Sequence, residues 1–366
     1  MCFQKKEINY KTAFARFSYL SSHCIRTKNK KIISLLQYLL FLGLAVFLVW
    51  WSLGKIEHKD WLDIKGAWLR ADFWLLIPVV LILLASHLSR AVRWKILMQP
   101  MGYKPSLLNV YLAVLVSYIA NLAIPRLGEV LKCTILSRYE KVPADKLVGT
   151  VVAERAFDLV CLAIIFAITL FSQMDIIGTY ASGMLDNIFN SGSNSTAMRI
   201  VNWLIVITAL IVFFATIRWL FKKFAHISLV QKIKGILRNI WHGLTSIRYL
   251  QNKGWFIFHT VLIWILYLAA IRVGMAAMKE TSIYGIKESL SVLCMGSIGM
   301  IATQGGVGAY PLLVQETMML YGLTENMGKA FGWLLWLVQF FMVIICGAIS
   351  LFLLPVINRK RKDEKP

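Results

Sequence analysis

Charged side chains stand inside segments that otherwise have the composition of lipid-soluble helices. Glu154, Arg155 and Asp158 fall within the apolar stretch 147–171. A charge at bilayer depth costs about 2.5–3.5 kcal/mol on insertion scales, so such side chains usually face a paired or wet interior. On a helix Glu154 and Asp158 share one face, and Arg155 is also close to Asp158. Two interpretations stay open: an ion-pair knot between helices, or a polar lining that contacts a headgroup or relays protons.

Two arginines, Arg90 and Arg93, are spaced i,i+3 near the end of a second apolar stretch, 73–97. Arginine can grip a phosphate through two parallel hydrogen bonds, which lysine cannot. The alternative is anchoring at the cytoplasmic membrane surface, where basic and aromatic side chains such as Trp94 gather. The two arginines are also able to neutralise the acidic residues of the other motifs.

The segment 121–129 combines a helix breaker, a glycine and charges of both signs. Pro125 lacks an N–H group and blocks the preceding helical turn. The amides after the break are predicted to bind an anion at the N-terminus of the next helix, with a plain loop as the alternative. The candidate substrate-binding residues of this segment are Asn121, Arg126 and Glu129.

A second break follows further along, in the run Gln304-Gly305-Gly306-Val307-Gly308. Glycine permits positive φ and close backbone approach, so at least one of these glycines is predicted to have a positive φ. The next helix would begin with N–H groups that favour an anion, and Glu316 lies about two turns along it. A packing turn of small residues is the alternative. The candidates here are Gln304, Gly305, Gly306, Gly308 and Glu316.

The composition excludes an ordinary soluble domain. Of 366 residues, 58% are hydrophobic and 16% charged, and the net charge is +22. Soluble domains have about 45–50% apolar and about 25% charged residues. The basic excess lies mostly in loops and termini, which indicates membrane orientation and not nucleic-acid binding. The six cysteines lack the spacing of a disulfide framework or a zinc site, so we expect no metal and no cofactor.

The apolar runs predict an all-α, polytopic transmembrane helical bundle with about six full spans and two re-entrant helical hairpins. The expected spans are 32–53, 73–97, 147–171, 200–221, 255–278 and 330–356, with a short loop over 55–70. One hairpin, 107–124 with 126–139, is expected to enter from the cytoplasm, and the other, 289–302 with 310–321, from outside. Such broken helices in two inverted halves are typical of transporter binding sites.

Charge divides the chain into three expected parts. They are a basic cytoplasmic segment (1–31), a transmembrane domain (32–356) that includes a cytoplasmic amphipathic helix (222–253), and a basic cytoplasmic tail (357–366). Both termini are therefore expected in the cytoplasm.

Four motifs occur in a fixed order: Ser89 to Trp94, Asn121 to Glu129, Val152 to Asp158, and Gly305 to Tyr310. In these motifs the chain resembles the lysylphosphatidylglycerol synthase transmembrane region family, also called flippase-like membrane proteins, over most of its length. The resemblance implies a lipid-flipping domain of a bacterial-type inner (plasma) membrane. Bifunctional members carry a soluble aminoacyl-transfer domain after this region, which is not expected here, so we expect no enzyme activity. Lys132 stands where many relatives have arginine.

We therefore expect a protein that moves, or helps to move, an anionic or polar-headed lipid between leaflets. Arginines would hold the phosphate, and acidic residues would pair with them or accept a cationic headgroup or a proton. Two alternatives are a membrane enzyme or subunit acting on lipid-linked substrates, and a non-transporting scaffold that recruits a partner through 222–253. The expected partners are membrane phospholipids and no nucleic acid, with a homo-oligomer or a partner lipid-modifying enzyme left open.

Overall fold

The computed structural model describes residues 58–124, 126–173 and 250–363, with a few isolated positions besides. Every regular element in these ranges is helical, which confirms the all-α class. The first part contains α2 (His58–Arg70), η1 (Phe73–Leu75), α3 (Leu76–Met98), η2 (Gln99–Met101), α4 (Leu107–Ala123), α5 (Leu127–Glu140) and α6 (Ala144–Ser172). The second contains α10 (Lys253–Ala276), α11 (Ile286–Ala302), η4 (Gln304–Gly306), α12 (Ala309–Leu320) and α13 (Glu325–Asp363).

Three stretches of the described chain are long and apolar enough to cross a membrane: Phe73–Met101, Lys253–Ala276 and Glu325–Arg359. Helix α6 has 29 residues and is also long enough, although it carries the charged cluster. The expected segment 1–31, the spans 32–53 and 200–221, and nearly all of the amphipathic segment 222–253 lie outside the described residues.

Four shorter helices form two helical hairpins, α4 with α5 and α11 with α12. They have 17, 14, 17 and 12 residues, so at about 1.5 Å per residue none of them reaches across about 30 Å of hydrocarbon alone. Helix α4 ends at Ala123, and the next residue, Ile124, is extended because Pro125 follows it. Arg126 then adopts a left-handed conformation with φ of 65°, which turns the chain into α5.

The second hairpin turns at the glycine run. Gly305, Gly306 and Gly308 have φ of 63°, 71° and 73°, which confirms the prediction of a positive φ in this run. The tips of the two hairpins touch each other. The side-chain amide of Gln304 donates to the backbone oxygen of Leu122 at 2.7 Å, and the indole of Trp336 donates to the backbone oxygen of Gly305 at 2.9 Å.

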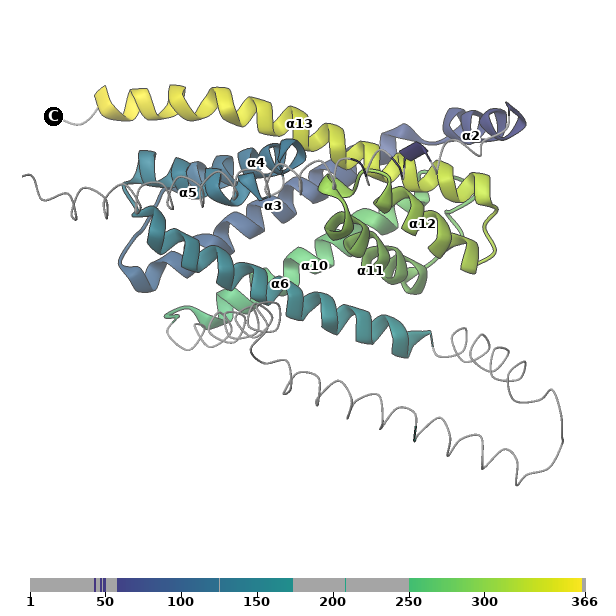
Figure 1. The fold of residues 1–366 in the computed structure, drawn as a ribbon, viewed down its shortest axis with the longest axis horizontal. Helices are drawn as coiled ribbons and strands as arrows, with labels where there is room; N and C mark the ends of the chain where they lie inside the picture. Colours follow the sequence, from purple (N-terminus) through teal and green to yellow (C-terminus); the bar gives the residue numbers. More distant parts are fainter. Residues whose placement is uncertain are drawn as a thin grey trace, which may run out of the picture.

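The two hairpins approach this contact from opposite ends of the molecule, with α3, α6, α10 and α13 running past both (Figure 1). At one end Asn252, which precedes α10, bonds Gln99 after α3, and Asn109 of α4 bonds Asn358 of α13. At the other end Gln173, which follows α6, bonds the backbone oxygen of Lys287 on α11. The hairpin tips therefore meet between the two ends of the bundle, although Ile124 and Arg126 at the first tip are exposed.

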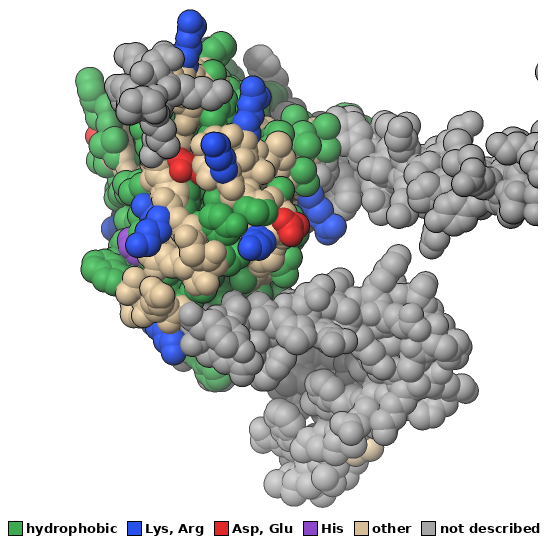
Figure 2. Space-filling view, turned by 90° about the vertical axis from the view of Figure 1, so that its left-hand side faces the viewer, with side chains coloured by type: hydrophobic (Ala, Val, Ile, Leu, Met, Phe, Trp, Pro, Cys, Tyr) green, Lys and Arg blue, Asp and Glu red, His purple; other side chains and the backbone are tan. Residues whose placement is uncertain are grey.

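The end that contains the α4–α5 hairpin bears many basic side chains. Figure 2 views this end and shows Lys and Arg side chains spread over it, with few acidic ones among them. The exposed basic residues of its loops and helix ends are Lys104, Arg138, Lys141, Lys146 and Lys253. The opposite end mixes both signs, as in the ion pair of Arg70 with Glu280.

The expectation of a loop over 55–70 is wrong, because residues 58–70 form α2. Ile64 and Ala67 are buried against the core that α13 helps to form, and the Trp68 indole donates to the backbone oxygen of Ala330 at 3.0 Å. The mixed charge of this segment marks its exposed face, whereas the apolar residues at helical spacing bury the other face.

Candidate functional site: an amphipathic cavity with a charged end

A cavity of about 680 Å³ lies in the middle of the bundle, between both hairpin tips and the long helices. One part of its wall is charged and comprises Arg90, Arg126, Arg155 and Asp158. Most of the remaining wall is apolar, with Val79, Leu83, Ile271, Leu293, Leu335 and Phe340 among its members. A site of this size and polarity suits an amphiphile with one charged end.

The cavity reaches the surface beside α6 and α11. Leu159 and Ile301 line it and are themselves 50% and 69% exposed. An opening bordered by apolar side chains admits the hydrocarbon part of a ligand without desolvating polar groups.

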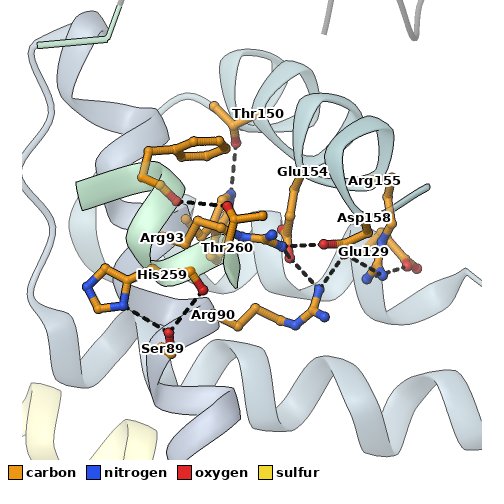
Figure 3. Close-up of polar contacts among 12 residues, drawn as sticks. Ser89, Arg90, Arg93, Glu129, Thr150, Glu154, Arg155, Asp158, His259 and Thr260 are labelled. Carbon is orange, nitrogen blue, oxygen red and sulfur yellow. Dashed lines mark hydrogen bonds and ion pairs between the residues drawn. The ribbon is translucent and has the colours of Figure 1, made fainter. Parts of the chain in front are cut away.

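Glu154 is the buried centre of the charged cluster. It is fully buried, and its two carboxylate oxygens accept from Arg90 Nη1 at 2.9 Å and from Lys132 Nζ at 2.7 Å (Figure 3 shows the contacts of Glu154 with the arginines). Arg93 Nη2 lies 3.6 Å from the same carboxylate. Glu154 does not line the cavity, and neither does Arg93. The geometry therefore favours the ion-pair knot for these two residues.

Asp158 lies one turn further along α6 and does line the cavity. Its carboxylate accepts from Arg90 Nη1 at 2.7 Å and from Arg93 Nη2 at 2.6 Å, as Figure 3 shows. The Tyr267 hydroxyl accepts a third bond from Arg90 at 3.2 Å. Arg90 thus joins α3, α6 and α10 while one edge of it faces the cavity.

Lys132 belongs to this cluster although it was not a candidate. Its ammonium group pairs with Glu154 and lies 4.4 Å from the centre of the Trp94 ring. The sequence feature that could have indicated its role is its spacing, three residues after Glu129 on a helix. An amphipathic helix with exposed charges explains the same spacing equally well.

Arg155 and Arg126 carry the charge that the knot does not absorb. Arg155 is half exposed, 3.3 Å from Glu129 and 3.8 Å from Asp158. Arg126 is exposed and lines the cavity, and no acidic residue of the described chain pairs with it. The site as a whole sets five cations against three acids: Arg90, Arg93, Arg126, Lys132 and Arg155 against Glu129, Glu154 and Asp158. This excess favours an anion in the cavity.

At the N-terminus of α5, where an anion site was predicted, two of the first amides have partners within the protein. The side-chain oxygen of Asn121 accepts from the Gly128 amide at 2.8 Å, and the Leu127 amide donates to Ile124. Asn121 of α4 thus caps α5 through the Gly128 amide, and the backbone of the turn satisfies the Leu127 amide. Asn121 therefore supports the turn and does not line the cavity.

The glycine loop contributes less of the cavity wall than its composition indicates. Gly305 lines the cavity, whereas Gln304, Gly306 and Gly308 do not. Gly306 and Gly308 are buried, and Gly306 lies close to Met300 and Tyr310 of its own hairpin. Glu316 is exposed on α12, accepts a hydrogen bond from its neighbour Gln315 and does not line the cavity.

Uncharged polar residues on the cavity wall were missed by the sequence reasoning. His87, Tyr118 and Tyr267 all line it. A single histidine or tyrosine in an apolar run has no spacing signal, because it is equally compatible with packing. His259, whose ring nitrogen lies 2.9 Å from the Ser89 hydroxyl, is outside the cavity wall and forms a contact between α3 and α10 (Figure 3).

Gly306→Val is expected to abolish any activity that depends on the hairpin contact. A β-branched residue at φ of 71° is strained, and a Cβ atom there would approach Met300 Sδ to 2.5 Å. Leaflet exchange by the reconstituted variant, at folded yield checked by size-exclusion chromatography, measures the effect. Gly254→Ala is the control, because a Cβ atom at Gly254 would have open space around it. Gly274→Ala is unsuitable for this purpose, because its Cβ atom would lie 2.5 Å from the Leu335 side chain. Full exchange by the valine variant would contradict the prediction.

A bundle of long apolar helices around two broken hairpins, with a cavity charged at one end, defines a helical membrane protein with an amphipathic interior cavity. The chain belongs to the Lysylphosphatidylglycerol synthase TM region family, whose model matches residues 35–347. It is 22% identical over 331 residues to a UPF0104 membrane protein of Methanocaldococcus jannaschii, covering 80% of this chain and 88% of that protein. No solved structure matches the chain.

Proposed function

We propose that this protein moves a lipid with an anionic or polar headgroup between the two leaflets of the membrane. The family associates the chain with lipid handling in a membrane. The observation that carries the proposal is the central cavity, which combines unpaired basic charge at one end with apolar walls and an apolar opening. A headgroup crossing the bilayer needs this combination, because a charge in hydrocarbon is costly without a polar partner.

In this proposal the two hairpins are re-entrant and meet inside the bilayer. Their tips touch through Gln304 and Leu122, and they come from opposite ends of the bundle. The basic end, with Lys104 and Lys141, would face the cytoplasm of an inner (plasma) membrane, together with both termini. Irregular backbone at membrane depth is tolerated where it lies within protein or lines a polar cavity, as Gly305 does here.

The proposal assigns no chemical reaction to the site. Asp158 is the single acidic residue among the described cavity-lining residues, and arginines hold both of its oxygens. A general base needs a carboxylate oxygen within reach of the substrate proton.

The partners that the proposal requires are membrane phospholipids. A second copy of the chain or a lipid-modifying enzyme stands as an additional candidate, and the basic residues are assigned to the membrane surface.

Arg126→Gln tests this function without dismantling the fold. The side chain is exposed and has no ion-pair partner in the described chain, so stability should change little, while the site loses its unpaired positive charge. We expect the full chain in liposomes to accelerate leaflet exchange of a fluorescent anionic phospholipid. The exchange rate of the variant should be lower by a factor of at least about ten, because the loss of one charge-assisted hydrogen bond costs about 1.5–3 kcal/mol.

Arg138→Gln is the matched control, because Arg138 is an exposed arginine in α5, the helix that follows Arg126, and does not line the cavity. Its exchange rate should equal that of the unchanged protein. Absence of exchange by the folded, unchanged protein with both anionic and zwitterionic lipids would reject the function.

A further inference from the structure

One stripe of α3 lines the cavity from its apolar part to its charged part. Val79, Leu83, His87 and Arg90 all contribute to the wall, at spacings of four, four and three residues. Side chains at these spacings follow one face of a helix. The stripe therefore changes from hydrocarbon to a neutral polar group to a cation along a single line.

His87 is the unexplained member of this stripe. It is 5% exposed, and neither of its ring nitrogens has a hydrogen-bond partner within the described residues. The Tyr118 ring lies against it, with ring centres 4.5 Å apart, and fixes its position beside the cavity. A neutral imidazole has one donor and one acceptor, and buried polar groups are seldom left unbonded.

The order of groups along the stripe matches the order of groups along a glycerophospholipid. Acyl chains suit Val79 and Leu83, and a phosphate suits Arg90 together with Arg126, which also lines the cavity and has no ion-pair partner among the described residues. Between them a glycerophospholipid carries its ester carbonyls, which accept hydrogen bonds. His87 stands one helical turn from Arg90, about 5–6 Å between Cβ atoms, so it faces this intermediate level.

We propose that His87 donates a hydrogen bond to an ester carbonyl of a glycerophospholipid whose phosphate is bound by the arginines of the cavity. The ligand is then a whole ester-linked lipid and not a headgroup alone. This inference rests on the cavity being the lipid site of the proposed function, and it adds the substrate class and a specificity-determining residue.

Matched lipids test the inference. The purified full chain is titrated with two phospholipids that share one anionic headgroup and chain length, one with ester and one with ether linkages, and binding is followed by native mass spectrometry. An ether has no carbonyl, so the unchanged protein should bind the ester lipid about fivefold more tightly, the effect of one neutral hydrogen bond. His87→Leu should bind both lipids equally, and His87→Gln, which keeps a donor, should retain part of the preference.

Ser86→Ala is the control, because Ser86 is buried beside His87 but bonds its own helix at Leu83 and does not line the cavity. It should keep the ester preference. Equal binding of the two lipids by the unchanged protein, or an unchanged preference in both His87 variants, would overturn the inference. So would binding of inorganic phosphate alone that is lost in His87→Leu, because His87 would then serve a free anion. A His87-dependent ester preference without leaflet exchange would reject the proposed transport but uphold this inference.

Discussion

Glu154→Gln is expected to lower the free energy of unfolding by about 3–5 kcal/mol, the usual effect of removing one partner of a buried ion pair. Glu154 is fully buried and neutralises Arg90 and Lys132 directly. Glutamine keeps the shape but leaves Lys132, itself 2% exposed, without a counter-charge. Thermal or denaturant unfolding of the detergent-solubilised protein, followed by size-exclusion chromatography, measures the loss.

Two further variants identify the cause. Glu316→Gln removes an exposed carboxylate away from the cluster and should leave the unfolding transition unchanged. Adding Lys132→Met to Glu154→Gln removes the unpaired ammonium group and should restore part of the lost stability, because an apolar pair is often as stable as a buried ionic one. If Glu154→Gln unfolds like the unchanged protein but exchanges lipid slowly, Glu154 acts in the lipid path and the knot is the wrong interpretation.

Gly128→Ala is the second substitution with a large expected effect. A Cβ atom at Gly128 would overlap the backbone oxygen of Ser117 and would lie 2.7 Å from the Asn121 side chain. Neither α4 nor α5 can yield to this, because the obstacle is backbone and Asn121 is the α5 cap. We expect a loss of about 3 kcal/mol or more, at or above the upper end for overpacking, and a low yield of folded protein.

Gly149→Ala provides the comparison in a neighbouring helix. Gly149 lies in α6 with no atom within 4 Å of its would-be Cβ. Alanine there should be neutral or stabilising by roughly 0.5–1 kcal/mol, because it reduces the backbone entropy of the unfolded chain. Equal stability of the two alanine variants in chemical unfolding would contradict the close approach of α4 to α5.

The helix boundaries were largely predictable because strong local signals fix them. Pro125 ends α4 where it was predicted to end, and the glycines at 305–308 separate α11 from α12 as expected. Such residues determine the conformation of their own backbone, so a helix end can be predicted from them without knowledge of the tertiary contacts. Helix α2 was missed because its stability comes from packing on α13, a contact that the local mixture of charges does not reveal.

The site was predictable in its residue types and much less in its partners. Helical spacing correctly predicted that Glu154 and Asp158 share one face of their helix. It does not predict which cations of other helices pair with them. Lys132 illustrates this, since its partner Glu154 is on the next helix. Glu316 illustrates the reverse: it follows a glycine break at a plausible distance, yet the orientation of α12 turns it outward. Orientation after a left-handed turn depends on tertiary packing.

The contacts of Arg90 also constrain the order in which the protein assembles. Arg90 and Arg93 are synthesised well before their partners, because Glu154 and Asp158 follow 64 and 68 residues after Arg90. Until α6 emerges from the ribosome, the C-terminal part of α3 carries two cations without counter-charges. It should stay near the polar headgroups, because an unpaired charge is costly in hydrocarbon. The same argument applies to the hairpin of α4 and α5, because the partner of Lys132 is also Glu154, which is synthesised later. Helices α3 to α6 should therefore insert into the bilayer as one cooperative unit. Insertion of α6 would supply the counter-charges that the other helices need.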